Sequence, residues 1–387
     1  MSTPPPYQPG LLRQRRATGA PIGVLIVLGV VAAAVLLVLG AQHPVGLIVS
    51  VPLTAGAMAV VVAGYLWLDK WEPEPTRLLL LAFLWGATVA VVVSLVLELA
   101  TSAVLGDGIT LTLIGPAIEE AAKGAFVLVM LTGARRREFD GVVDGLVYAG
   151  FAAIGFAFIE DVGYIAETFG QGTDVTITTV VLRLVLAPFA HPLFTSLIGY
   201  GIGVASTRTG SGRWLYPVAG YLGAVALHAL WNSSLTFGLA GYLVVYLVIM
   251  VPAFVVAVLV ARQARRRERD VVNRQLPVLV YYRWISPAEA AWLASIAARR
   301  VWLRSVRRRS GTAGVRALQA FQQAATELAF LRDRVERGVG PPDAYWQHEE
   351  LVRALATTRA AAQAPMRENP VSAGLIRPQP PRLGQPG

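Results

Sequence analysis

Three ionisable side chains lie in the middle of an apolar stretch that is long enough to cross a bilayer. The stretch covers residues 111–130 and contains Glu119, Glu120 and Lys123. A charged side chain at the centre of a membrane helix costs about 2.5–3.5 kcal/mol on insertion scales, so such residues usually have partners and a function. On a helix, Lys123 lies one turn from both glutamates, at spacings of four and three residues. The lysine can neutralise either carboxylate, and the other carboxylate needs a partner from another segment.

Other apolar stretches contain polar groups of the required kinds. Glu160 lies in FAFIEDVGY, His191 in APFAHPLF, and His228 and Asn232 in ALHALWN. Together these residue types supply a general base, proton carriers and donors for an oxyanion, which suits water attack on a carbonyl group. We therefore predict one hydrolytic site, to which the first, second, third and eighth apolar stretches contribute nothing comparable. Its predicted residues are Glu119, Glu120, Lys123, Glu160, His191, His228 and Asn232.

The composition indicates a polytopic membrane protein. Hydrophobic residues make up 55% of the 387 residues, and charged residues only 15%. Cysteine is absent, which excludes disulfides, thiolate nucleophiles and cysteine-ligated zinc. The formal net charge is +10, but the arginines cluster beside the apolar stretches, where they set topology and meet anionic lipid headgroups. We expect membrane lipids, and no nucleic acid, as partners of these arginines.

The apolar stretches and the loop charges together predict a topology. Basic residues occur in every second connection, and the connections between them contain none, which places both termini in the cytoplasm. We predict an all-α polytopic helix bundle in the cell membrane, with about eight transmembrane helices and a cytoplasmic helical C-terminal extension. The expected spans are residues 21–40, 44–68, 78–99, 111–132, 145–166, 178–205, 215–236 and 240–261.

The chain changes character outside this bundle. The expected parts are a disordered cytoplasmic tail at 1–20, the transmembrane domain at 21–262, a basic cytoplasmic helical region at 263–363, and a Pro-rich disordered tail at 364–387.

The basic helical region begins with a recognisable helix start. Ser286 and Glu289 form a capping-box pattern that predicts a helix through about Arg309, and SGTAG should interrupt it before further helices at 314–337 and 342–363. The arginines of the first helix suit either contact with an anionic leaflet or a solvated helical hairpin.

Several motifs, in this order and spacing, resemble the PrsW family of intramembrane proteases, which is similar to the larger CAAX-protease and bacteriocin-processing group. They are EEAAK at 119–123, FxxxExxxY at 156–164, the isolated His191 and HALWN at 228–232, with DKWEPEP at 69–75 in addition. The resemblance covers residues 30–260. It implies proteolysis of membrane-anchored substrates, such as single-span anti-sigma factors.

The resemblance also implies roles for the site residues. Glu119 and Glu120 would activate water, Lys123 would steady them, and Glu160, His191, His228 and Asn232 would complete the site. The wider group has histidine where this chain has Glu160, which leaves the second proton carrier open.

The metal dependence of the site stays open at this point. The family is commonly labelled as metalloproteases, and Glu160, His191 and His228 with one water would hold zinc or another divalent cation. The same residues suit a metal-free glutamate mechanism, and Lys123 already places a cation beside the glutamates. A proton-coupled transporter and a catalytically inactive membrane scaffold are the alternative functions, although no inverted repeat is visible.

Overall fold

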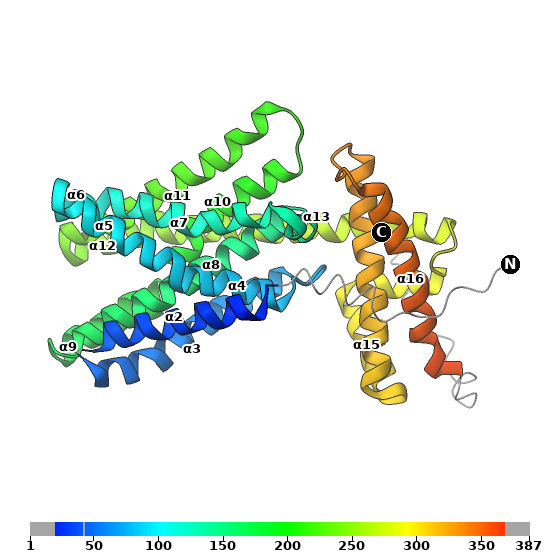
Figure 1. Ribbon diagram of the computed structural model, residues 1–387, viewed down its shortest axis with the longest axis horizontal. Coiled ribbons are helices and arrows are strands. Elements are labelled where there is room, and N and C mark those ends of the chain that lie inside the picture. The colour runs from blue at the N-terminus through cyan, green and yellow to red at the C-terminus, as the bar shows by residue number, and fades with distance from the viewer. Residues whose placement is uncertain (1–19, 42, 368–387) are drawn as a thin grey trace, which may run out of the picture. The chain divides into compact units, whose positions relative to one another are not determined.

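The structure is a computed structural model that describes residues 20–41 and 43–367. Every regular element in this part of the chain is a helix, and no strand occurs there (Figure 1). The predicted all-α membrane bundle is therefore confirmed. The predicted tails lie outside the described residues, except for Ala20 and residues 364–367, which end the last helix.

The described residues form two compact units. The transmembrane unit contains the described residues from Ala20 to Asp69 and residues 73–264, and the C-terminal unit contains residues 70–72 and 265–367.

The transmembrane unit consists of α-helices interrupted by short π-helical and 3₁₀ segments. In chain order these are α2 (Ile22–Gly40), α3 (Pro44–Leu68), α4 (Thr76–Trp85), η2 (Gly86–Ala90), α5 (Val91–Leu105), α6 (Asp107–Ile109), η3 (Thr110–Ile114), α7 (Gly115–Met130), η4 (Gly133–Glu138), α8 (Val142–Thr168), α9 (Thr173–Val180), η5 (Val181–Leu186), α10 (Ala190–Ser206), η6 (Ser211–Trp214), α11 (Leu215–Ser234), η7 (Leu235–Phe237), α12 (Gly238–Val245), η8 (Tyr246–Met250) and α13 (Val251–Tyr281), which continues into the C-terminal unit.

Six helical runs in the described part of the chain are long and apolar enough to cross a membrane. Five of the predicted spans each fall on one of these runs. The predicted span 111–132 falls on η3 and α7, and α7 has only 16 residues. The predicted spans 215–236 and 240–261 both fall within the continuous helical run Ser211–Tyr281. The number of crossings and the side on which the termini lie stay predictions.

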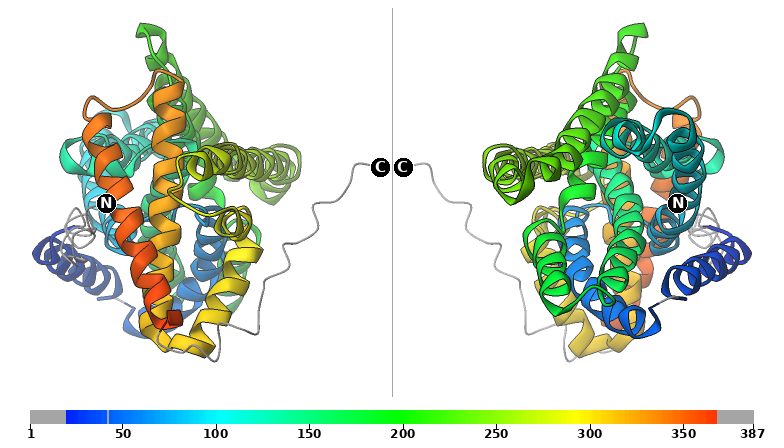
Figure 2. Two further views of the ribbon diagram at one scale, coloured as in Figure 1. Left: turned by 90° about the vertical axis from the view of Figure 1, so that its right-hand side faces the viewer. Right: turned by 90° about the vertical axis from the view of Figure 1, so that its left-hand side faces the viewer.

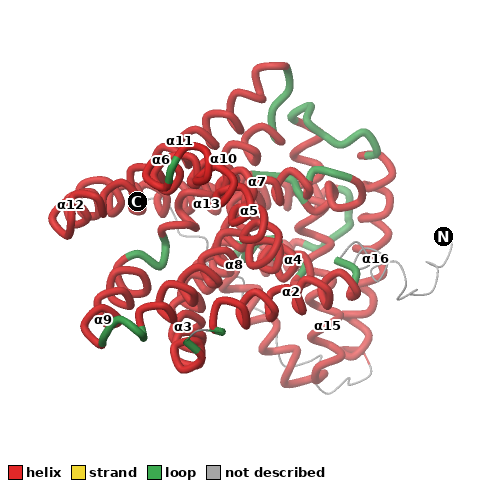
Figure 3. Tube along the Cα trace, turned by 60° about the vertical axis from the view of Figure 1, so that its left-hand side comes forward, coloured by secondary structure: helices red, strands yellow, loops and turns green. Residues whose placement is uncertain are grey.

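α8 is the central helix of the transmembrane unit, and 89% of its most apolar 18-residue segment is buried. It packs against α3, α4, α7 and α10 (Figure 3), and the end-on views show the helices running side by side (Figure 2). Glycine permits this packing, because a Cβ atom on Gly145 would lie 2.2 Å from the carbonyl oxygen of Gly199 in α10. Backbones in direct contact are typical of small-residue interfaces between membrane helices.

Two helices that contribute to the centre of the bundle begin after irregular segments. The π-helical segment η3 precedes α7, and η5 precedes the break before α10. Wider turns of this kind leave backbone carbonyls that need other donors in a membrane. Asn232 donates from Nδ2 to the carbonyl of Leu111 in η3 at 3.1 Å, and Tyr242 donates from Oη to the carbonyl of Leu182 in η5 at 3.0 Å. Side chains of α11 and α12 thereby fix both segments.

The C-terminal unit has a hydrophobic core of its own. It contains the end of α13, α14 (Pro287–Leu293), α15 (Ile296–Glu336) and α16 (Ala344–Arg367). The predicted capping box is confirmed, because Ser286 accepts from the backbone of Glu289 while the Glu289 carboxylate accepts from the backbone of Ser286. The predicted interruption is confirmed at Gly311, whose φ of 59° breaks α15.

One arginine of α15 is buried in this unit. Arg299 is 6% exposed, its Nε donates to the carbonyl of Leu293, and its guanidinium lies 4.7 Å from the ring of Trp71. Burial lowers the pKa of Arg299 to about 10. α15 packs along α16, and whether the exposed arginines of α15 contact an anionic leaflet stays a prediction.

Candidate active site

The lysine and the two glutamates of α7 form a buried ionic cluster. Nζ of Lys123 lies 2.7 Å from Oε1 of Glu120 and 3.2 Å from Oε2 of Glu119. The lysine side chain is 0% exposed, and its ammonium lies 4.3 Å from the ring centroid of Phe156 in α8. The ammonium thus contacts both carboxylates, as the spacing of three and four residues allows, but its single positive charge balances only one of them.

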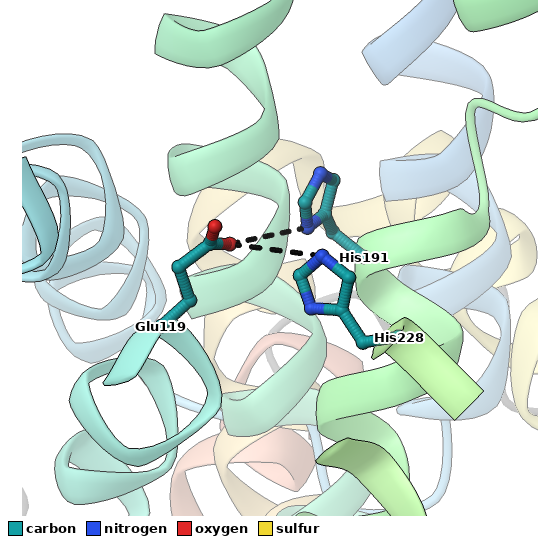
Figure 4. Close-up of side chains that lie close together, drawn as sticks. All are labelled: Glu119, His191 and His228. Atoms are coloured by element: carbon teal, nitrogen blue, oxygen red, sulfur yellow. Dashed lines mark ion pairs between the residues drawn. The ribbon is translucent and has the colours of Figure 1, made fainter. Parts of the chain in front are cut away.

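Two histidines from other helices face Glu119 (Figure 4). His191 is the second residue of α10, and its Nδ1 lies 4.0 Å from Oε2 of Glu119. His228 lies in α11, and its Nε2 lies 3.9 Å from the same oxygen. One atom of each of the three side chains lies within 4.8 Å of the others, which is close enough for all three to hold a metal ion.

The remaining nitrogen of each ring contacts a carboxylate. Nε2 of His191 lies 2.5 Å from Oε2 of Glu160, and Nδ1 of His228 lies 3.0 Å from Oε1 of Glu120. Lys123 lies 3.2 Å from Nδ1 of His191 and can only donate, so this nitrogen accepts and Nε2 carries the proton. In the same way the Glu120 carboxylate fixes a proton on Nδ1 of His228. When both rings are neutral, each therefore turns its unprotonated nitrogen towards Glu119.

Glu119 and Glu120 have different surroundings. Glu120 is 0% exposed, and besides Lys123 and His228 it accepts a hydrogen bond from Oγ1 of Thr195 at 2.8 Å. Glu119 is 7% exposed, and the contacts that place it all involve Oε2. Of the two carboxylates, Glu119 is the more exposed.

The motifs and geometry correspond to a known family. Residues 74–257 match the family model described as PrsW family intramembrane metalloprotease. This region of the chain, residues 74–257, belongs to the PrsW family. The family is described as one of intramembrane proteases, so the chain is an intramembrane endopeptidase, and the alternative of a transporter is not favoured.

Curated relatives agree with this assignment. The chain is 28% identical over 224 residues to Protease PrsW of Oceanobacillus iheyensis, a match that covers 57% of this chain and 98% of the relative. It is 27% identical over 154 residues to Protease PrsW of Clostridioides difficile, covering 38% of this chain and 63% of the relative. It is 26% identical over 178 residues to Protease PrsW of Geobacillus kaustophilus, covering 46% of this chain and 75% of the relative. No solved structure matches the chain.

Six of the seven residues predicted for the site of this PrsW relative lie together. Asn232 does not join them, because its amide contacts the carbonyl of Leu111. Glu160, predicted as a metal ligand with His191 and His228, contacts the nitrogen of His191 that faces away from Glu119. The group of side chains that could hold a metal has Glu119 in its place.

Two ionisable residues near the site were missed by the sequence analysis. Arg183 in η5 lies 3.2 Å from Glu160 and 2.5 Å from Asp161. Glu98 in α5 lies within electrostatic range of Glu119, and its Oε1 is buried without a hydrogen-bond partner among the described residues. The expectation that the third apolar stretch contributes nothing comparable is therefore wrong. Both residues interrupt apolar stretches, and the same insertion cost that singled out Glu119 would have found them.

Proposed function

We propose that this PrsW relative hydrolyses a peptide bond of a membrane protein at the cluster formed by Glu119, His191 and His228. The observation that carries the proposal is the orientation of the two rings. Each presents an unprotonated nitrogen to Oε2 of Glu119, and each has a carboxylate on its other nitrogen. Carboxylate-oriented imidazoles are characteristic of metal-ligating histidines.

The charges of the cluster support a divalent cation at this position. Five carboxylates lie here beside two cations: Glu98, Glu119, Glu120, Glu160 and Asp161, with Lys123 and Arg183. When all five carboxylates are ionised and both histidines are neutral, three negative charges have no counterpart, and a divalent cation would balance two of them. A buried charge without compensation is strongly unfavourable in a membrane.

The donor set fits zinc. Glu119, His191 and His228 would hold it through one carboxylate oxygen and two imidazole nitrogens, which leaves a fourth position for water or substrate. When bound, the ion would supply Lewis-acid polarisation of the carbonyl and a water of lowered pKa. Glu160, the third ligand expected from the sequence, would instead contact Nε2 of His191, the nitrogen that faces away from Glu119.

The chain's own residues can supply the proton transfers. Glu119 has two oxygens, so one can face the histidines while the other accepts the proton of the attacking water and returns it to the leaving amine. The Lys123 ammonium can stabilise the negative charge that develops on the carbonyl oxygen. Glu120 and Thr195 keep Lys123 and His228 in place, since Glu120 contacts both.

We propose a single-span membrane protein, such as an anti-sigma factor, as the substrate. Support comes from the family and from the burial of the cluster, which only a segment at membrane depth could approach. A proton-coupled transporter would also place carboxylates at this depth, but the family assignment does not favour it. An inactive scaffold would not need two rings fixed in one orientation.

Cleavage of reconstituted substrates tests the proposal. The probe is a panel of single-span fusion proteins in lipid nanodiscs, each carrying a different fluorophore on either side of the span. Wild type should separate the fluorophores, whereas Glu119→Ala, Glu120→Ala and His191→Ala should lose most of the activity. The control Asn232→Ala should retain more activity than these variants. Unchanged cleavage in all three site variants would refute the proposal.

A further inference from the structure

Arg183 makes contacts that reach the site through Glu160. It lies in η5, within the helical run Thr173–Ser206, and its side chain is 25% exposed. Nε donates to Oδ1 of Asp161 at 2.5 Å, and Nη2 lies 3.2 Å from Oε2 of Glu160. The guanidinium also lies over the ring of Tyr164, 4.1 Å from its centroid. The planar fork thus joins two neighbouring carboxylates of α8.

A single oxygen atom links Arg183 to the ring of His191. Oε2 of Glu160 is the atom that contacts Nη2 of Arg183, and it also lies 2.5 Å from Nε2 of His191. The position of this oxygen decides whether Nε2 has an acceptor for its proton. The opposite nitrogen, Nδ1, is the one that faces Glu119.

We propose that Arg183 is a positioning residue, which holds Glu160 against Nε2 of His191 and so fixes the unprotonated Nδ1 towards Glu119. The proposal rests on the proposed function for its consequence in catalysis, but its geometric claim is independent of it. Arg183 touches neither of the ring nitrogens and acts only through Glu160.

The surroundings of Arg183 restrict its movement. Asp161 contacts Nε of the guanidinium, and the Asp161 side chain is 5% exposed. The backbone is held one residue earlier, where the carbonyl of Leu182 accepts from Oη of Tyr242, itself 2% exposed. A lysine at this position would be a single point charge and could not hold both carboxylates in the same geometry.

Zinc affinity provides the first test. The double variant Arg183→Gln with Asp161→Asn removes one charge of each sign, so that it leaves the net charge of the cluster unchanged. We expect it to bind zinc about 10–100-fold more weakly than wild type, as is usual when a ligand loses its orienting partner. Arg208→Gln, at an arginine outside the site, should bind zinc as wild type does. Arg183→Lys should bind zinc more tightly than the double variant and more weakly than wild type.

A double-mutant cycle separates positioning from general stability. If Arg183 acts through Glu160, adding the Arg183 and Asp161 changes to Glu160→Gln should weaken zinc binding by no more than about 2-fold further. Independent losses that multiply would overturn the proposal. So would a variant that unfolds at a lower temperature but binds zinc as tightly as wild type.

Nitrogen-15 NMR of the histidines provides a test that does not need a metal. The chain has four histidines, and His191→Asn would assign the signals of His191. Wild type should show the Nε2-protonated form of this ring. The Arg183/Asp161 double variant should show a shifted Nε2 signal, because the proton on Nε2 loses its fixed acceptor while Lys123 still donates to Nδ1. An unchanged His191 spectrum would overturn the proposal. If wild type binds no zinc, but the His191 signals still differ between wild type and the double variant as expected, the metal site is refuted and the positioning role of Arg183 is supported.

Discussion

Replacing Lys123 by methionine should tighten the binding of a divalent cation to the site. Nζ of Lys123 lies 3.2 Å from Oε2 of Glu119 and 3.2 Å from Nδ1 of His191, which are two of the three candidate ligand atoms. A metal ion and the ammonium cannot both occupy this space. Metal binding therefore requires the ammonium to give up its contacts with Glu119 and His191 while it keeps the one with Glu120.

The magnitude follows from the charges. Two unit charges 4 Å apart interact by about 4 kcal/mol at an effective dielectric constant of about 20, and a divalent ion doubles this to about 8 kcal/mol. The flexible lysine avoids most of this repulsion by moving. We expect a remaining gain of about 1.4–2.8 kcal/mol in the variant, which is about 10–100-fold tighter binding.

The assay is a zinc titration of detergent-purified protein against a chromophoric chelator. Methionine keeps the length of the side chain and its contact with Phe156, and Lys123→Arg is the control that keeps the charge. The methionine variant leaves the buried Glu120 without its cation, a loss of about 3–5 kcal/mol in stability. Its unfolding temperature should therefore rise steeply with added zinc. If Lys123→Met binds zinc no more tightly than wild type and Lys123→Arg, the lysine does not compete with a metal, and the reasoning is refuted.

Three further outcomes are expected. Thr195→Val should lower the stability by about 1.5–3 kcal/mol, because it removes a hydrogen bond to the buried Glu120 carboxylate, whereas Thr195→Ser should not; thermal unfolding distinguishes them. Burial raises the pKa of Asp69, in the loop before α4, to about 7, so the stability it contributes is present below about pH 4 and is lost as the pH rises through 7; Asp69→Asn should flatten the dependence of unfolding temperature on pH over this range. Gly145→Val should separate α8 from Gly199 and reduce cleavage together with stability, while an equal loss for Gly212→Val, in open space, would contradict the packing argument.

Much of the site could be predicted because a membrane makes ionisable residues conspicuous. Glu119, Glu120 and Lys123 share a helix face by their spacing alone, and His191 and His228 are conspicuous in apolar stretches. The structure brings these residues together with Glu160. Their catalytic roles stay predictions, since the geometry shows proximity and not turnover.

The remaining features depend on properties that no spacing encodes. Asn232 follows His228 by one turn and was expected in the site, but the π-helical η3 leaves the Leu111 carbonyl in need of a donor, and Asn232 supplies it. Glu160 was expected to bind a metal with His191 and His228, and in the structure it contacts Arg183 and the nitrogen of His191 that faces away from Glu119. Which nitrogen of a ring faces which carboxylate is set by helix rotation and rotamers, so it emerges only from the packed bundle.

X-ray absorption at the zinc edge of the purified protein tests the central claim most directly. Zinc held by Glu119, His191 and His228 should show one ion per chain, with nitrogen and oxygen scatterers at about 2.0–2.1 Å and the outer-shell signal of two imidazoles. His228→Asn should reduce that signal to one imidazole. A wild-type protein that cleaves substrate without bound metal, or whose zinc shows no imidazole, would contradict the assignment of these three residues as a metal site.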